Sequence, residues 1–132
     1  IRYCLLSRGL GDVYKRQKIY HNIDWKNEMS LVHVLAVITA KPGKRAEVLE
    51  NFNNNVPAVH AEEGCIEYGA VIDSPEASSF SAPFGPNTFV VVEKWESLDH
   101  LKAHAAAPHM KAYAEKNKDL LADRKVHVMT SV

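Results

Sequence analysis

The hydrophobic positions of this chain follow two different spacings. Residues 31–40 are dense in Val, Leu and Ile, without a regular polar position, and a Lys-Pro-Gly turn follows them. This pattern predicts a strand with both faces buried. Residues 44–63 then show helical spacing, and Gly64 stands where a C-terminal cap belongs. The apolar positions of this predicted helix are Leu49, Phe52, Val56 and Val59.

The second half of the chain repeats the alternation of strands and helix. Residues 65–72 and 88–95 are predicted strands, and the Ser-, Pro- and Gly-rich segment between them is too long for a tight hairpin. Ser97 is a good N-cap for a helix over residues 98–107. Pro108 interrupts that helix before a second helical piece, which runs toward residue 121.

A last short strand is predicted over residues 125–130. The order of elements is then β-α-β-β-α-β, which is typical of an α+β, ferredoxin-like fold with an antiparallel sheet and two helices on one face. In the first strand, Val34 and Ile38 alternate with Leu35 and Val37, so both faces of the sheet require burial. We therefore expect a homodimer that packs sheet against sheet.

The first 28 residues differ from the rest of the chain. Residues 1–17 have no clean period and resemble translated adaptor sequence, and residues 18–28 are polar. We expect residues 1–28 to be a non-native or disordered leader and residues 29–132 to form the domain, with Met29 as the natural start. This domain carries ten basic and thirteen acidic side chains, a net charge of −3.

Composition narrows the classes of partner. The whole chain has 16 basic and 16 acidic side chains, which gives no electrostatic footprint for nucleic acid or for a membrane surface. Its two cysteines are too few for a Cys-based zinc site, and such sparse usage favours a reducing compartment. These features predict a cytoplasmic protein with a small, neutral or weakly ionised partner.

His104 is the main candidate for chemistry. On a helical wheel counted from Ser97, it lies at the rim of the apolar arc formed by Leu98, Leu101 and Ala105. An imidazole there can act as a general base for a phenolic hydroxyl. It can equally be a core-edge side chain bonded to a backbone carbonyl, and the spacing alone leaves both interpretations open.

Three segments carry a family resemblance: 63–68 (Glu-Gly-Cys-Ile-Glu-Tyr), 89–95 (Phe-Val-Val-Val-Glu-Lys-Trp) and 101–104 (Leu-Lys-Ala-His). They resemble the antibiotic biosynthesis monooxygenase family, in particular its small quinol monooxygenase-like members. The resemblance covers residues 29–132. It implies a dimeric ferredoxin-like domain with a pocket between helices and sheet, in which some members oxygenate electron-rich aromatics without metal or organic cofactor.

The expected reaction is therefore oxidation of a hydroquinone-like or polyphenolic substrate by dioxygen, without a cofactor. A quinol gives up an electron more readily as its anion, so the enzyme must remove a proton, and His104 is the predicted base. Seven residues are predicted to bind the substrate, with no metal ligands among them. They are Trp95, Tyr68, Glu93, Phe52, His60, His109 and Met110.

Other functions stay open at this level. His100 and His104 stand four residues apart, but no carboxylate lies between them and no third ligand is evident, which disfavours a metal site. Haem binding is disfavoured because the axial position of haem-degrading relatives falls near Ala114. The alternatives are an isomerase or decarboxylase of small metabolites and a ligand-binding stress-response dimer without turnover.

Overall fold

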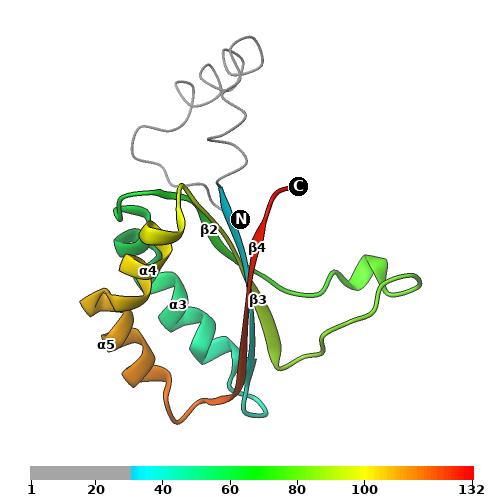
Figure 1. Ribbon diagram of the computed structural model, residues 1–132. Helices are drawn as coiled ribbons and strands as arrows, with labels where there is room; N and C mark the ends of the chain where they lie inside the picture. The colour runs from blue at the N-terminus through cyan, green and yellow to red at the C-terminus, as the bar shows by residue number, and fades with distance from the viewer. Residues whose placement is uncertain (1–30) are drawn as a thin grey trace.

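The computed structural model describes residues 31–132, so the predicted leader, residues 1–28, lies outside the described part. Its core is a four-stranded sheet in the order β2-β3-β1-β4, with α-helices packed on one face (Figure 1). The elements in chain order are β1 (Val32–Ala40), α3 (Arg45–His60), β2 (Cys65–Val71), the short 3-10 helix η1 (Pro75–Ala77), β3 (Thr88–Trp95), α4 (Leu98–Ala106), α5 (Pro108–Asn117) and β4 (Leu121–Thr130).

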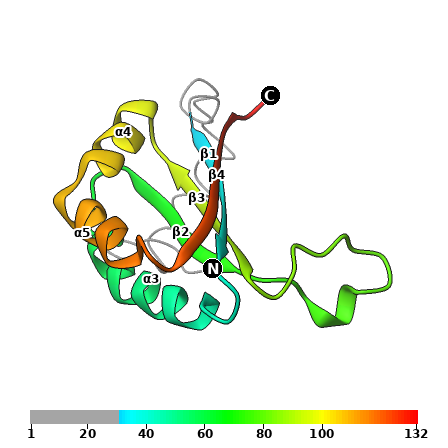
Figure 2. The same ribbon diagram turned by 90° about the horizontal axis from the view of Figure 1, so that it is seen from below.

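All neighbouring strands run antiparallel, which confirms the ferredoxin-like prediction. The central strand β1 pairs with β3, where Val32 lies opposite Trp95, and with β4, where Val34 lies opposite Val128. The edge strand β2 pairs with β3. Seen along the sheet, α3, α4 and α5 form a single layer against one side of it (Figure 2).

Alternate residues of β1 fill the space between sheet and helices. Val34 and Ala36 point into the core with Phe89 and Trp95 of β3, and all four are buried. Helix α3 contributes its own apolar stripe, as its helical spacing predicted. The structure buries Val48 where the sequence suggested Leu49, which is only partly buried at the edge of the core.

The C-terminal boundaries differ from the prediction. Helix α5 ends at Asn117, whose buried side chain accepts a hydrogen bond from Asn51 and donates one to the carbonyl of Tyr113. Strand β4 begins at Leu121 instead of residue 125, because a bulge in the β1–β4 ladder lets Leu121 pair with Ala40. The edge strand β4 is therefore four residues longer at its start than predicted. All of its residues except Leu121 are exposed.

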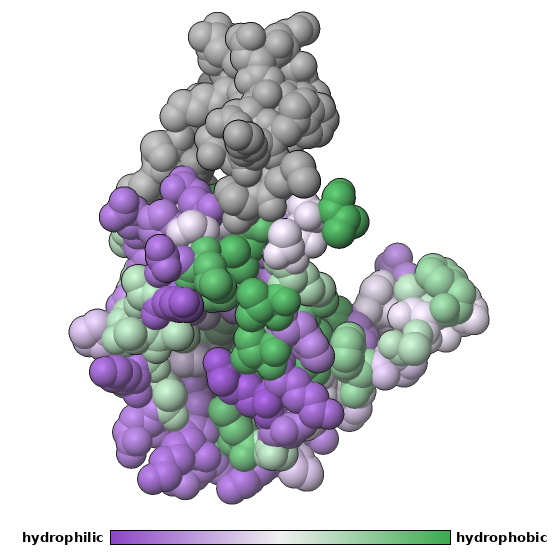
Figure 3. All heavy atoms as spheres, viewed as in Figure 1, coloured by the Kyte–Doolittle hydropathy of each residue, from purple (hydrophilic) through white to green (hydrophobic). Residues whose placement is uncertain are grey.

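Apolar side chains are exposed on and around this edge strand. In the space-filling view, apolar side chains are visible over the region where Figure 1 shows β4 (Figure 3). They include Leu35, Val126, Val128 and Met129, each between 37% and 51% exposed. Within the described residues, no helix is long and apolar enough to cross a membrane.

Residues 73–87 form an arm that extends away from the sheet (Figure 2). The two ends of the arm are joined by Asp73, whose carboxylate accepts hydrogen bonds from the backbone N–H groups of Phe84 at 2.9 Å and Gly85 at 2.8 Å. Arg45 of α3 donates to the carbonyls of Gly85 and Thr88. The base of the arm is therefore held by hydrogen bonds, while the side chains of Phe80 and Phe84 are exposed.

This closure of the arm should depend on pH. The two N–H donors lower the pKa of Asp73, because they stabilise its ionised form. A carboxyl with a lowered pKa in the folded state stabilises the closure above its ordinary pKa and loses that contribution as the pH falls. We expect the amide signals of Phe84 and Gly85 to titrate with a midpoint below the usual value for aspartate, as measured by NMR. Asp73→Ala should abolish this titration and speed hydrogen exchange at both amides, and an unchanged exchange rate would contradict the closure.

Candidate functional site

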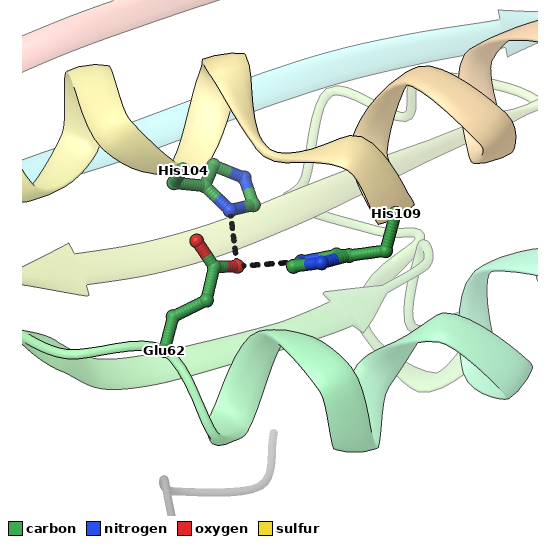
Figure 4. Close-up of side chains that lie close together, drawn as sticks. All are labelled: Glu62, His104 and His109. Carbon is green, nitrogen blue, oxygen red and sulfur yellow. Dashed lines mark hydrogen bonds and ion pairs between the residues drawn. The ribbon is translucent and has the colours of Figure 1, made fainter.

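Three side chains meet where α3, α4 and α5 come together above the sheet (Figure 4). The Oε2 atom of Glu62 accepts a hydrogen bond from Nδ1 of His104 at 2.8 Å and another from Nε2 of His109 at 3.0 Å. His104 is 5% exposed, and Glu62 and His109 are partly buried. The carboxylate of Glu62 thus accepts a hydrogen bond from each of two imidazoles, and the three side chains are largely shielded from solvent.

Local sequence explains how these side chains converge. The Ser97 hydroxyl accepts from the backbone N–H of His100 and starts α4, which directs His104 inward one turn later. Pro108 ends that helix and opens α5, so His109 falls in the first turn of a helix with a new direction. The break thereby brings two histidines five positions apart onto the same carboxylate.

Glu62 comes from the turn after α3, and Gly64 shapes this turn. Gly64 has a positive φ of +83°, which side chains disfavour, and a Cβ at this position would collide with the side chain of His100. Its carbonyl accepts the N–H of Glu96 at 2.8 Å, which ties the turn to the end of β3. The glycine therefore lets the turn lie close against α4, where Glu62 reaches His104.

Aromatic rings surround His104. The Trp95 ring lies 4.7 Å from the imidazole, centroid to centroid, and the Tyr68 ring lies 5.4 Å away in an edge-to-face arrangement. Phe52 stacks on the far side of Tyr68 at 5.2 Å. His104 thus lies beside two aromatic rings that come from adjacent strands of the sheet, Tyr68 from β2 and Trp95 from β3.

Glu93 is a second buried carboxyl beside His104. Trp95 donates its indole N–H to Oε1 of Glu93 at 2.9 Å, and the same oxygen lies 4.0 Å from Nε2 of His104. Burial raises the pKa of Glu93, and the indole hydrogen bond and the nearby His104 partly oppose this. Burial likewise raises the pKa of Tyr68, so its hydroxyl keeps its proton and stays a hydrogen-bond donor. His104 therefore lies between two carboxyl groups, one at each ring nitrogen.

Two of the predicted substrate-binding residues have other partners. The Nε2 atom of His60 lies 3.0 Å from the backbone carbonyl of Tyr68, to which it donates. Met110 packs against the core, and its sulfur accepts from the amide of Asn55 at 3.3 Å. Neither forms a hydrogen bond or ring contact with His104 in the described part of the chain, so their contact with a substrate stays a prediction.

Sequence reasoning missed Glu62. A carboxylate at the C-terminal end of a helix is unfavourable for the helix dipole, so an unexplained Glu before Gly64 was the available signal. The pair His100 and His104 was considered instead because of its helical spacing. In the structure His100 faces Ser97, whose hydroxyl lies 2.7 Å from its Nδ1, and its Nε2 lies 3.8 Å from Glu63.

The site has the groups for proton transfer and for holding a cation. Because Glu62 accepts from Nδ1 of His104, the neutral imidazole carries its proton there and leaves a lone pair on Nε2. That atom can take a proton from a bound hydroxyl. Among the described residues, Glu62, His104 and His109 also form a group of metal-ligand type, with one donor atom from each within 4.8 Å of the others.

The chain is similar to known proteins along most of its length. Residues 31–116 match the family model described as antibiotic biosynthesis monooxygenase. A relative from Escherichia coli K12, named "Probable quinol monooxygenase YgiN", is 38% identical over 101 residues, which are 75% of this chain and 96% of the relative.

Solved structures show the same fold. A conserved protein from Methanosarcina mazei Go1 aligns with a TM-score of 0.69 at 21% identity, covering 82% of this chain and 99% of its own. Protein PA3566 from Pseudomonas aeruginosa aligns with a TM-score of 0.67 at 22% identity, covering 80% and 97%.

Proposed function

Because the chain belongs to the antibiotic biosynthesis monooxygenase family, we propose that it is a quinol monooxygenase that uses dioxygen and needs no cofactor. The observation that carries the proposal is the hydrogen bond from Nδ1 of His104 to Glu62, which leaves a lone pair on Nε2 that can act as a base beside two aromatic rings. The name of the Escherichia coli relative supports a quinol as the substrate class.

The proposed chemistry begins with proton transfer from a quinol hydroxyl to Nε2 of His104. The resulting imidazolium is stabilised by Glu62 at Nδ1, because an ionised partner strengthens that hydrogen bond. The quinolate is electron-rich enough to react with dioxygen. One oxygen atom forms a new C–O bond on the ring, and the other leaves as water with the proton returned by His104. Hydroquinone and dioxygen then give hydroxyquinone and water, and the substrate supplies all the electrons.

The remaining residues have supporting roles in this proposal. Tyr68 stays protonated and can donate a hydrogen bond to the developing quinolate oxygen. Trp95 and Phe52 provide flat apolar surface around the reacting ring, and His109 holds Glu62 in place. Glu93 accepts a hydrogen bond from the indole N–H of Trp95 and thereby fixes the orientation of that ring.

Oxygen uptake tests this function. The full chain, treated with a chelator and dialysed, should consume dioxygen with one or more members of a panel of hydroquinones and naphthoquinols. The rate should exceed autoxidation in buffer and should scale with protein concentration. Uptake that never exceeds the buffer rate, or that appears only after a metal ion is restored, would contradict the proposal.

We also propose that the protein is a homodimer formed through the open face of the sheet. On this face Leu35 of β1 and Met129 of β4 are exposed, Val92 of β3 lies opposite Leu35, and Val37 follows two residues later on β1. Exposed contiguous apolar surface of this kind is typical of protein interfaces. A second copy would cover it. Nucleic acid and membranes are not expected partners, and a cytoplasmic location also stays a prediction.

Leu35→Glu should break the dimer, because it places a charge in the centre of the apolar face. Size-exclusion chromatography with light scattering should give the mass of two chains for the wild type and of one chain for this variant. Leu98→Glu is the matched control, since Leu98 is 48% exposed on α4, away from the open face, and this variant should stay dimeric. A monomeric wild type would refute the interface.

A further inference from the structure

The cluster at Glu62 has the composition of a transition-metal site. It offers two imidazole nitrogens and one carboxylate oxygen, the ligand types that bind zinc and similar divalent ions. The donor atoms of His104 and His109 lie 2.8 Å and 3.0 Å from Oε2 of Glu62. Tetrahedral ligands about 2.1 Å from a metal are about 3.4 Å apart, so each nitrogen must move roughly half an ångström away from the carboxylate oxygen to admit an ion. The two nitrogens lie within 4.8 Å of each other.

The surroundings of His104 independently fit a ligand histidine. A metal-bound histidine usually has a carboxylate near its other ring nitrogen, which fixes the orientation of the ring. Glu93 occupies that place, with Oε1 4.0 Å from Nε2 of His104. Trp95 in turn holds Glu93 through its indole N–H. This outer contact exists in the fold without any metal, and it comes from β3, a different element from those that supply the three ligands.

The charge of the cluster also favours a divalent cation. Two carboxyl groups lie near the ring nitrogens of His104, Glu62 at Nδ1 and Glu93 at Nε2. No lysine or arginine forms an ion pair with Glu62 or Glu93 within the described residues. In this part of the structure, the two carboxyl groups are therefore not paired with any basic side chain other than histidine.

We propose that Glu62, His104 and His109 bind a divalent transition-metal ion of the zinc type, and that the bound ion inhibits the enzyme. With Nδ1 on the metal, a neutral His104 carries its proton on Nε2 and loses the lone pair that accepts the substrate proton. The ion is thus an inhibitor and not a cofactor. The inhibition rests on the proposed function, whereas the binding site does not.

Metal titration of the chelator-treated full chain tests the site. Isothermal calorimetry with Zn²⁺, and visible absorption with Co²⁺, should show one ion per chain. Glu62→Gln and His109→Gln should each weaken binding by at least about 10-fold, as the loss of one ligand predicts. The matched control is His100→Gln, because His100 also faces a glutamate, Glu63, at 3.8 Å, but lies outside the cluster. Circular dichroism checks that every variant folds.

Each outcome decides the proposal. Binding that is lost in both cluster variants and kept in His100→Gln supports it. Absence of one-to-one binding, or equal binding by Glu62→Gln and the wild type, overturns it. Oxygen uptake is measured on the same samples with and without Zn²⁺. Metal binding without any turnover removes the proposed function but leaves the site, and turnover without metal binding removes the site but leaves the function. Equal turnover by the zinc-loaded and zinc-free chain overturns the inhibition.

Discussion

Replacing His104 by glutamine should lower the rate of quinol oxidation by about 100-fold or more, which is the usual contribution of a general base. Glutamine keeps the length and polarity of the side chain and can still donate a hydrogen bond to Glu62, but it cannot take up a proton at neutral pH. The measurement is dioxygen uptake at saturating quinol. We expect kcat to fall much more than KM changes, because the lost interaction belongs to the reaction step.

A matched control separates this effect from general damage to α4. His100→Gln makes the same chemical change one turn earlier on the helix, at a side chain that faces Ser97 and Glu63. It should keep kcat within about threefold of the wild type. A His104→Gln variant that is folded and nearly as active as the wild type would mean that another group removes the proton.

The second large effect is on stability. Gly64→Ala should reduce the free energy of unfolding by about 2–3 kcal/mol, measured by urea denaturation. The positive φ of Gly64 costs an L-residue about 1–2 kcal/mol, and the new methyl group meets the Cβ and ring of His100. The turn must then move away from α4, which also draws Glu62 away from His104.

Gly43 provides the control for this prediction. It has a similar positive φ of +78°, but a Cβ there meets nothing within 4 Å. Gly43→Ala should therefore show only the cost of the backbone conformation, about 1–2 kcal/mol. If both variants lower the free energy of unfolding by the same amount, the close approach of His100 to Gly64 does not contribute to stability. That result would contradict the tight packing of this turn against α4.

The fold could be predicted from the sequence because its signals are local and periodic. Dense Val and Ile predict the strand in residues 31–40, helical spacing from Leu49 to Val59 predicts the first helix, and Ser97 and Pro108 mark helix boundaries. The start of β4 was placed four residues late. Its position depends on pairing with Ala40 across a bulge, and pairing between residues far apart in the chain produces no local sequence pattern from which it could be predicted.

The candidate site was predictable only in part. His104 and Trp95 were identified because an imidazole on the rim of a helix and an aromatic residue at a strand end can be seen locally. The contact of Glu62 with His104 joins residues 42 positions apart, and it depends on how the Gly64 turn packs against α4. For the same reason, the sequence analysis weighed His100 with His104 and did not consider Glu62 and His109 together.

Isotope labelling tests the central claim most directly. The chelator-treated protein is supplied with a quinol that supports oxygen uptake, under ¹⁸O₂, and the quenched product is analysed by mass spectrometry. If the protein is a cofactor-free monooxygenase, one ¹⁸O atom appears in the hydroxyquinone and the other in water. An unlabelled quinone with labelled hydrogen peroxide, or no product above the buffer reaction, would contradict the account.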